Sequence, residues 1–174
     1  MGAGSDLRSL IRDVPDFPKP GIVFKDITPL LASPEALAKT IDALAEPFRA
    51  SGVTAVAGIE SRGFIFGACV ARALNAGFIP IRKPGKLPWT TRRHEYVLEY
   101  GSDTLEIHDD AVPRGGRILV VDDVLATGGT ASAAATLIRG FDCELVGVTT
   151  VIELTFLDPR KLLSGVNVHT LIQY

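Results

Sequence analysis

The sequence predicts an α/β protein built on a parallel, twisted sheet with helices on both faces. Short apolar runs rich in β-branched residues alternate along the chain with segments of helical periodicity. Unbroken apolar runs are typical of strands that are covered on both faces, and strands that alternate with helices form parallel sheets with right-handed crossovers. The clearest example is the segment 118–130, where a strand-like run ends in two aspartates and leads through small and hydroxyl residues into a helix.

The other elements follow from local signals. Ser33 can cap a helix, Pro34 suits its first position, and apolar residues at helical spacing extend this helix to about residue 49. The remaining predicted elements are a strand at 53–59, a helix at 63–76, a strand at 78–82, a strand at 118–123, a helix at 129–139 closed by Gly140, a strand at 145–153 and an edge strand at 166–172.

Two regions do not fit this alternation. Residues 1–32 contain several prolines and are expected to lie across the sheet rather than in it. Residues 84–95 are polar, basic and proline-bearing, and 96–107 resembles a two-stranded excursion around a turn. We expect a single domain of 174 residues, and we call the first region (about 1–32) the hood and the second (about 84–103) the flap.

Composition narrows the possible functions. The chain has a formal net charge of −2, which gives no reason to expect nucleic acid as a partner, because binding to a phosphate backbone needs a basic footprint. No apolar run approaches the roughly 18 residues that would cross a bilayer, and the first residues lack a signal-type apolar core. We therefore expect a cytoplasmic protein that acts on small molecules, with neither nucleic acid nor a membrane as partner.

The segment 118–130 carries the strongest functional signal. Asp122 and Asp123 end its strand, and backbone amides with two threonine hydroxyls follow at the start of a helix. Helix N-termini favour anions, and ligands of open α/β sheets collect at the carboxyl ends of the strands. Two acids beside an anion site suit a phosphorylated ribose. Taken singly, a Gly-Gly pair is usually only a turn, and an aspartate pair is often a solvated loop or a helix cap.

Residues 120–130 (Val-Val-Asp-Asp to Ala-Thr-Gly-Gly-Thr) resemble the phosphoribosyl-diphosphate motif of the type I phosphoribosyltransferases. Three further segments, in family order, resemble the members that act on adenine: 17–29, 61–64, and 82–88 followed by 98–101. The resemblance implies a Rossmann-like fold and a homodimer. It also implies a purine salvage enzyme that transfers the phosphoribosyl group from 5-phosphoribosyl 1-diphosphate to adenine, giving AMP and diphosphate.

The resemblance also implies roles for the residues of this segment. Asp122 and Asp123 would be catalytic, because they would bind the ribose hydroxyls and stabilise the positive charge that develops on the ribose as diphosphate leaves. Mg²⁺ would bind mainly through substrate phosphate oxygens near these aspartates, without a dedicated metal cage. The 5′-phosphate would lie in a cradle made of Ala126, Thr127, Gly128, Gly129 and Thr130.

Cationic side chains are expected to hold the diphosphate. Between residues 82 and 93 the chain has five basic residues and no acid, a pattern that in isolation is often only a solvated loop. The resemblance assigns Arg62, Arg82, Lys83 and Lys86 to diphosphate, some of them across a dimer interface, and leaves Arg92 and Arg93 as surface residues.

Proton transfer is assigned to the flap. Glu99 matches the flap glutamate of the family, which would contact the imidazole side of adenine and help it shift a proton as its ring nitrogen attacks the ribose. Without the resemblance, Glu99 would be interpreted as an exposed strand residue. The neighbouring Tyr100 is expected to contact substrate as well.

Base recognition is assigned to the hood. Phe24 would stack on the purine opposite Val124, while the backbone around Val23 and Lys25 pairs with the edge that carries the amino group. Phe24 considered alone could equally be a core aromatic residue.

Three residues depart from the usual family pattern. Lys25 replaces a common arginine, Val124 a common leucine, and Glu60 precedes Ser61 where aspartate is common. Family members often bend the peptide before this serine sharply, and the longer Glu60 leaves open whether the bend is kept. Two alternative functions are a regulator that senses phosphoribosyl diphosphate and a phosphoribosyltransferase for another base. The absence of a basic face argues against the first, and the hood resemblance argues against the second.

Overall fold

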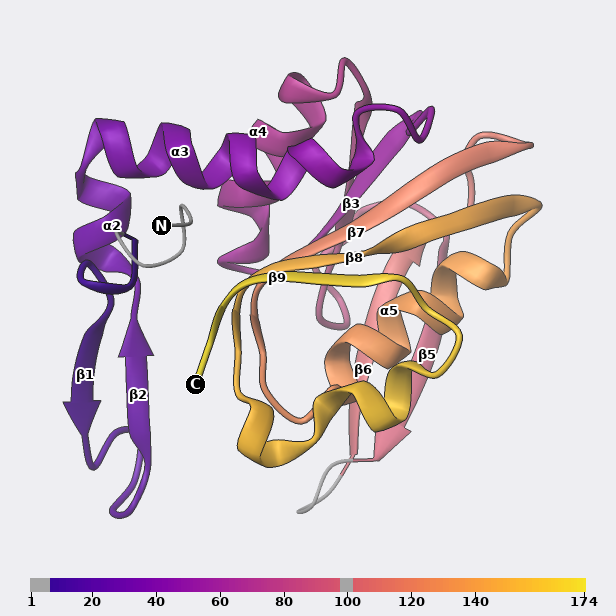
Figure 1. The fold of residues 1–174 in the computed structure, drawn as a ribbon. Helices are drawn as coiled ribbons and strands as arrows, with labels where there is room; N and C mark the ends of the chain where they lie inside the picture. Colours follow the sequence, from indigo (N-terminus) through magenta and orange to yellow (C-terminus); the bar gives the residue numbers. More distant parts are fainter. Residues whose placement is uncertain (1–6, 98–101) are drawn as a thin grey trace.

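The computed structural model describes residues 7–97 and 102–174, and a five-stranded parallel sheet forms its centre (Figure 1). The strand order is β4-β3-β7-β8-β9. The strands are β3 (Ala55–Ile59), β4 (Gly77–Ile81), β7 (Gly116–Leu125), β8 (Cys143–Glu153) and β9 (Val168–Gln173). This sheet confirms the predicted fold class, and β9 forms one edge as expected.

Helices cover both faces of this sheet. Figure 1 shows α3 (Pro34–Ala45) and α4 (Gly63–Ala73) on one face and α5 (Gly129–Arg139) on the other. Each strand contributes side chains to both faces, because successive side chains along a strand point in opposite directions. On β7, Leu119 and Val121 pack with α3 and α4, whereas Ile118 and Val120 pack toward α5. The two hydrophobic cores therefore share one sheet, and β7 contributes apolar side chains to both.

Several element boundaries differ from the sequence-based predictions. The helix predicted to run to about residue 49 ends at Ala45 and tightens into a 3₁₀ turn at Glu46–Phe48, because Pro47 has no N–H to continue the α-helical hydrogen bonds. Helix α4 ends at Ala73 rather than at 76, since Asn75 takes the left-handed conformation (φ 53°) that closes a helix. Strand β7 continues past the aspartate pair to Leu125.

The hood contains a separate two-stranded sheet. Strand β1 (Arg12–Pro15) pairs antiparallel with β2 (Val23–Asp26), and a short helix, α2 (Thr28–Ala32), which the sequence did not predict, leads from β2 toward α3. In Figure 1 this hairpin stands on the left, on the side toward which β9 runs to the C-terminus. Because the five strands are parallel, the hood lies on the side of their carboxyl ends.

The flap region is an antiparallel pair, β5 (Thr91–Val97) and β6 (Ser102–His108). This pair confirms the two-stranded excursion, but its first strand begins at Thr91, earlier than the expected start at 96. Its polar residues form a strand because β6 supplies the apolar partners: Leu105 and Ile107 are fully buried and pack toward α5. Within residues 7–97 and 102–174, no helix is both long and apolar enough to span a membrane.

Candidate active site

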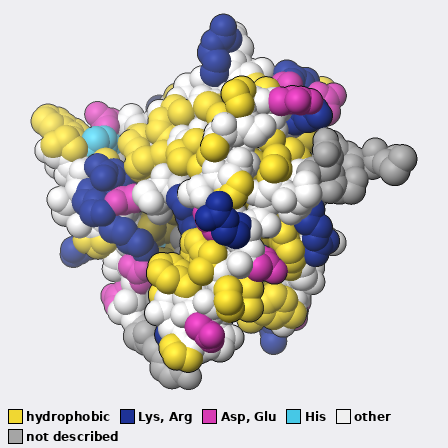
Figure 2. All heavy atoms as spheres, turned by 90° about the vertical axis from the view of Figure 1, so that its left-hand side faces the viewer, with side chains coloured by type: hydrophobic (Ala, Val, Ile, Leu, Met, Phe, Trp, Pro, Cys, Tyr) yellow, Lys and Arg dark blue, Asp and Glu magenta, His cyan; other side chains and the backbone are white. Residues whose placement is uncertain are grey.

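A cavity of 340 Å³ opens at the carboxyl ends of the parallel strands. Its lining comes from residues 60–62 after β3, from Lys83 after β4, and from 122–128 with 130–131 at the end of β7 and the start of α5. Figure 2 shows this side of the molecule, where Lys and Arg side chains lie beside a hollow in the surface. The predicted site residues that line the cavity are Arg62, Lys83, Asp122, Asp123, Val124, Ala126, Thr127, Gly128 and Thr130.

The aspartate pair lies at the inner end of this cavity. The Asp123 N–H donates to Asp122 Oδ1 at 2.9 Å, and α4 approaches so closely that a Cβ at Gly63 would lie 2.8 Å from the same oxygen. Burial raises the pKa of Asp122 well above its usual value, and the nearby Asp123 charge raises it further. Burial also raises the pKa of Asp123, against the opposing effect of Arg62.

One carboxylate oxygen of this pair has unused hydrogen-bonding capacity. Arg62 Nε lies 2.8 Å from Asp123 Oδ2, an ion pair. The contact lacks hydrogen-bond alignment, and Oδ2 is among the buried atoms of the described residues without a hydrogen-bond partner. Buried polar atoms are normally satisfied. An acceptor of this kind on a cavity-lining residue suits a ligand hydroxyl or a metal-bound water.

The cradle is the turn at residues 126–130 between β7 and α5. Gly128 adopts a positive φ of 85°, which few residues with a side chain tolerate. It also lies against the backbone of Pro159, whose carbonyl oxygen would be 2.3 Å from a Cβ at position 128. Gly129 and Thr130 begin α5, so the amides of this turn lie at the positive end of an 11-residue helix. The arrangement can bind a phosphate.

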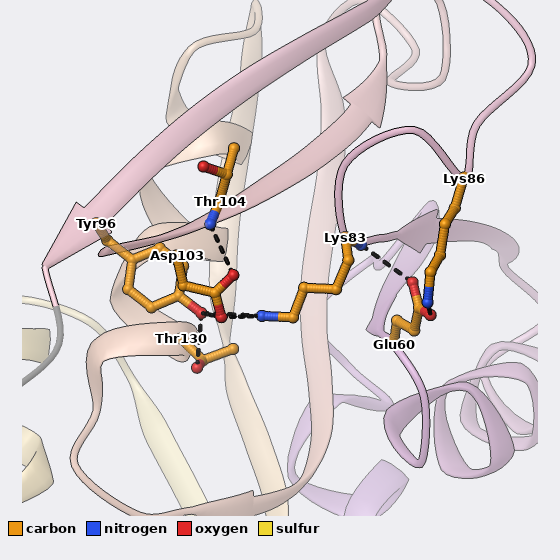
Figure 3. A network of polar contacts seen from close by, with 7 residues as sticks. All are labelled: Glu60, Lys83, Lys86, Tyr96, Asp103, Thr104 and Thr130. Carbon is orange, nitrogen blue, oxygen red and sulfur yellow. Dashed lines mark hydrogen bonds and ion pairs between the residues drawn. The ribbon is translucent and has the colours of Figure 1, made fainter. Parts of the chain in front are cut away.

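Glu60 organises the cations at the rim of the cavity. Its Oε2 accepts a hydrogen bond from Arg82 Nε at 3.2 Å. Figure 3 shows its other two contacts: Oε2 also accepts from the Lys83 N–H at 3.0 Å, and Oε1 pairs with the Lys86 ammonium. Burial alone would raise the pKa of Glu60, but the hydrogen bonds from Lys86, the Lys83 amide and Arg82 hold it below the usual value. Arg82 and Lys86, unlike Arg62 and Lys83, are not among the residues that line the cavity.

The Lys83 side chain joins the flap to the cradle. Its ammonium pairs with Asp103 on β6 and lies 3.4 Å from the Tyr96 hydroxyl on β5. That hydroxyl is also hydrogen-bonded to Asp103 and lies 3.2 Å from Thr130 Oγ1 (Figure 3). Burial would lower the pKa of Lys83, but Asp103 raises it, so this lysine stays charged. Sequence reasoning missed both Asp103 and Tyr96, and it treated Glu60 only as a departure from a pattern.

The peptide between Glu60 and Ser61 is cis, so the structure keeps the bend that the sequence left open. The next residue, Arg62, faces the hood as well as Asp123. Its guanidinium lies 5.1 Å from the centroid of the Phe24 ring. The hood and the phosphate side of the site therefore meet at one arginine.

The other hood residues lie on β2. Phe24 packs edge-on against Phe17 with 5.2 Å between ring centroids, and it is not among the residues that line the cavity. Val23 is half exposed, and the Lys25 ammonium pairs with Asp13 at 2.7 Å while lying 4.0 Å from the ring centroid of Tyr174. Val124 lines the cavity. The structure thus places Val124 at the cavity and Phe24 next to its lining residue Arg62, whereas Val23 and Lys25 do not line it.

Two of the predicted site residues lie outside the part of the chain that the structure describes. They are Glu99 and Tyr100, within 98–101. Among residues 7–97 and 102–174, no group of three or more His, Cys, Asp or Glu side chains is placed to hold a metal ion.

Comparison with known proteins places this fold and site in a family. Residues 26–161 match the phosphoribosyl transferase domain, and the chain belongs to the phosphoribosyltransferase family. An adenine phosphoribosyltransferase from Acaryochloris marina is 57% identical over 97% of this chain and 99% of its own. One from Myxococcus xanthus is 55% identical over 98% of this chain and 92% of its own. Within the family, the chain therefore belongs to the adenine phosphoribosyltransferases.

Solved structures agree with this assignment. The crystal structure of adenine phosphoribosyltransferase from Rhodothermus marinus superposes with a TM-score of 0.94 at 54% identity, covering 99% of this chain and 98% of the other. The enzyme from Saccharomyces cerevisiae was solved with adenine and an imino-altritol bisphosphate. It gives a TM-score of 0.91 at 40% identity, and the match covers 97% of this chain and 98% of the other. The five-stranded sheet and its flanking helices are thus those of a type I phosphoribosyltransferase.

Proposed function

We propose that this protein is a purine salvage enzyme that transfers the 5-phosphoribosyl group from 5-phosphoribosyl 1-diphosphate to adenine, giving AMP and diphosphate. The observation that carries the proposal is the single cavity that joins a buried aspartate pair to a phosphate-binding turn. The relatives named above are adenine phosphoribosyltransferases, and the one from S. cerevisiae was solved with adenine.

The phosphoribosyl group would lie along the end of β7. The amides of the cradle and the hydroxyls of Thr127 and Thr130 would hold its 5′-phosphate, and Asp123 Oδ2 would accept a hydrogen bond from a ribose hydroxyl. As the bond to diphosphate breaks, positive charge develops on the ribose, and the buried Asp122 and Asp123 would stabilise it. This role needs carboxylates that are held before the reaction, and here the Asp123 N–H bonds to Asp122 while Arg62 pairs with Asp123.

We also propose Mg²⁺ as cofactor, held by substrate phosphate oxygens and, directly or through water, by Asp122 and Asp123. Two observations fit this ion: Asp123 carries a buried oxygen without a hydrogen bond, and the two carboxyl groups lie side by side in a buried position where a bound cation would favour their charged forms. When bound, Mg²⁺ would neutralise charge on the departing diphosphate.

The diphosphate would be held by Arg62 and Lys83, which line the cavity, and by Arg82 and Lys86 at its rim. Glu60 supports this assignment, because it fixes both rim cations at one point beside the cavity. Glu99 would handle the proton of adenine, with Tyr100 beside it. The purine would lie between Phe24 and Val124, with its amino edge paired to the backbone of Val23 and Lys25.

A homodimer is part of this proposal. Large exposed hydrophobic side chains, among them Ile65 on α4 and Phe78 on β4, provide apolar surface for a second copy. Equilibrium ultracentrifugation at micromolar concentration should show a dimer, and a monomer alone would contradict it. The cytoplasmic location remains a prediction from the sequence.

The deciding experiment is an assay of diphosphate release by the purified protein with adenine, hypoxanthine or guanine. We expect turnover with adenine only, because a 6-oxo purine would leave buried polar groups of the hood unpaired. Comparable turnover with hypoxanthine would overturn the hood assignment. Binding of phosphoribosyl diphosphate without turnover on any base would favour a sensing regulator instead.

A further inference from the structure

The outer wall of the cradle is a loop, residues 153–160, that leaves the end of β8. At its start, the Leu154 N–H donates to the carbonyl of Leu125 at 2.9 Å, one residue before the cradle. At its end, Pro159 is buried with its backbone against Gly128. The loop therefore bonds to the residue that precedes the cradle near its start and contacts the cradle itself near its end.

One ion pair closes this loop. Arg160 donates from Nε to Glu153 Oε1 at 2.7 Å and from Nη2 to Oε2 at 2.8 Å. This bidentate contact fixes the orientation of the guanidinium as well as its distance from the carboxylate. Glu153 is 2% exposed, and its Oε2 also accepts from Thr170 Oγ1 at 2.8 Å and from Gln173 Nε2 at 3.0 Å. The pair thus ties both ends of the loop to each other and to strand β9.

Between these ends the loop is weakly packed. Phe156 is 72% exposed, Leu157 is 42% exposed, and Asp158 adopts a left-handed φ of 48°. Early in the loop, the N–H and hydroxyl of Thr155 both donate to the Tyr174 carbonyl. After Asp158, the contacts that hold the chain next to Pro159 are those of Arg160 with Glu153 and the Val168 carbonyl, and the burial of Leu163 on the α5 side of the sheet. Neither Glu153 nor Arg160 is among the residues that line the cavity, so neither is placed to touch a ligand there.

We propose that Arg160, held by Glu153, is a positioning residue for the cradle: it keeps Pro159 against Gly128 and so sets the affinity for ligands that carry a 5′-phosphate. The inference rests on the proposed function, in which the cradle binds that phosphate. Its consequence is selective. Phosphoribosyl diphosphate, AMP and ribose 5-phosphate depend on the cradle, whereas adenine and inorganic diphosphate do not.

The test uses the full-length protein with Arg160→Lys and Arg160→Met. Binding of AMP and of inorganic diphosphate is measured by calorimetry, and the KM values for phosphoribosyl diphosphate and adenine by diphosphate release. A displacement of about 1 Å in a group that positions the substrate can lower the reaction rate by about 10²-fold. We expect AMP affinity to fall about tenfold or more, with a matching rise in the KM for phosphoribosyl diphosphate. The affinity for inorganic diphosphate and the KM for adenine should each change less than about twofold.

The matched control is Arg49→Lys. Arg49 also contacts carboxylates, Glu46 at 2.7 Å and Asp42 at 3.2 Å, but it follows α3 at the amino-terminal end of the sheet. We expect this variant to leave all four constants unchanged. Thr170→Val removes one donor to Glu153 and the weak 3.5 Å contact that Thr170 Oγ1 makes with Arg160 Nη2, but it keeps the Arg160 side chain and both of its bonds to Glu153. It should show a weaker form of the same selective loss. It keeps the inference testable if the Arg160 variants fail to fold by circular dichroism.

The outcomes separate the inference from the proposed function. If the unaltered protein releases no diphosphate and binds no AMP, the proposed function fails. If the unaltered protein is active but the variants bind AMP normally, or lose AMP and inorganic diphosphate in parallel, only the positioning role of Arg160 fails.

Discussion

Arg62 and Asp123 form an ion pair, with 2.8 Å between Nε and Oδ2, at the point where the hood meets the parallel sheet. Asp123 is 4% exposed, whereas the Arg62 side chain is 40% exposed, so a partly solvated cation compensates a buried anion. The same guanidinium lies over the ring of Phe24. One side chain therefore connects the ribose, diphosphate and base sides of the proposed site.

Arg62→Ala should lower kcat/KM for phosphoribosyl diphosphate by about 10- to 100-fold, because a hydrogen bond to a charged group contributes about 1.5–3 kcal/mol. It also leaves Asp123 buried without its cation, so the pKa of Asp123 should rise further. Steady-state kinetics would measure the loss. Arg72→Ala, an exposed arginine at the end of α4, is the control, and equal kinetics for the two variants would contradict the role of Arg62.

Gly128→Ala should disable the cradle. The new Cβ would meet the Pro159 carbonyl oxygen at 2.3 Å and would also suffer the strain of a positive φ, about 1–2 kcal/mol. Gly115→Ala separates the two effects, since Gly115 has a φ of 68° with nothing within 4 Å of the added atom. We expect both variants to lose thermal stability, but only Gly128→Ala to lose AMP binding. AMP binding that survives in Gly128→Ala would contradict the cradle assignment.

Glu153 should contribute to stability in a pH-dependent way. Hydrogen bonds from Arg160, Thr170 and Gln173 lower the pKa of Glu153 to about 2, against an ordinary value of 4.5. A lowered pKa stabilises the folded state above the unfolded value, so this contribution is complete above about pH 4.5 and is lost as pH falls toward 2. Its upper limit is about 3 kcal/mol, reduced by solvent screening at the half-exposed Arg160.

Urea unfolding at several pH values would measure this contribution. Glu153→Gln should lower the free energy of unfolding at pH 7 and flatten its decline between pH 5 and 2.5. Glu46→Gln is the control, because Glu46 pairs with Arg49 through a side chain that is 72% exposed, and such pairs contribute little. Identical acid profiles for Glu153→Gln and the unaltered protein would show that Glu153 has no such role.

Glu99→Gln tests the proton-transfer assignment made from the sequence. We expect turnover to fall by about 10²-fold or more while phosphoribosyl diphosphate still binds, because general acid–base catalysis is typically of this size. Glu95→Gln, an exposed glutamate on β5, should be nearly neutral. Near-normal turnover in Glu99→Gln would refute the assignment.

Elements defined by their own residues could be predicted from the sequence. Helix α5 has the predicted bounds, and the buried strands follow their apolar runs, since burial on both faces leaves a local signal. Boundaries that depend on one backbone conformation, such as the end of α4 at Asn75, were missed. So was the start of β5, because its polar residues form a strand only through their pairing with β6.

The site, too, has a part that could be predicted from the sequence and a part that could not. The aspartates and the cradle are contiguous in the chain, so a motif revealed them. The contacts of Glu60 with Arg82 and Lys86, and of Lys83 with Asp103, join segments about 20 residues apart or more, and nothing local in the sequence indicates them. Glu153 was predicted only as the last residue of a strand, because its partners Thr170 and Gln173 are contributed by the neighbouring strand.

The carboxylates of Glu60 and Asp103 have a consequence for how an anion enters and leaves. Lys86 and Lys83 have counter-ions within the protein itself, so a diphosphate bound as proposed would exchange places with a carboxylate instead of meeting an unpaired positive charge. On departure the exchange would run in reverse, and each lysine would return to its carboxylate. Such an arrangement would favour release of the diphosphate over its tight retention.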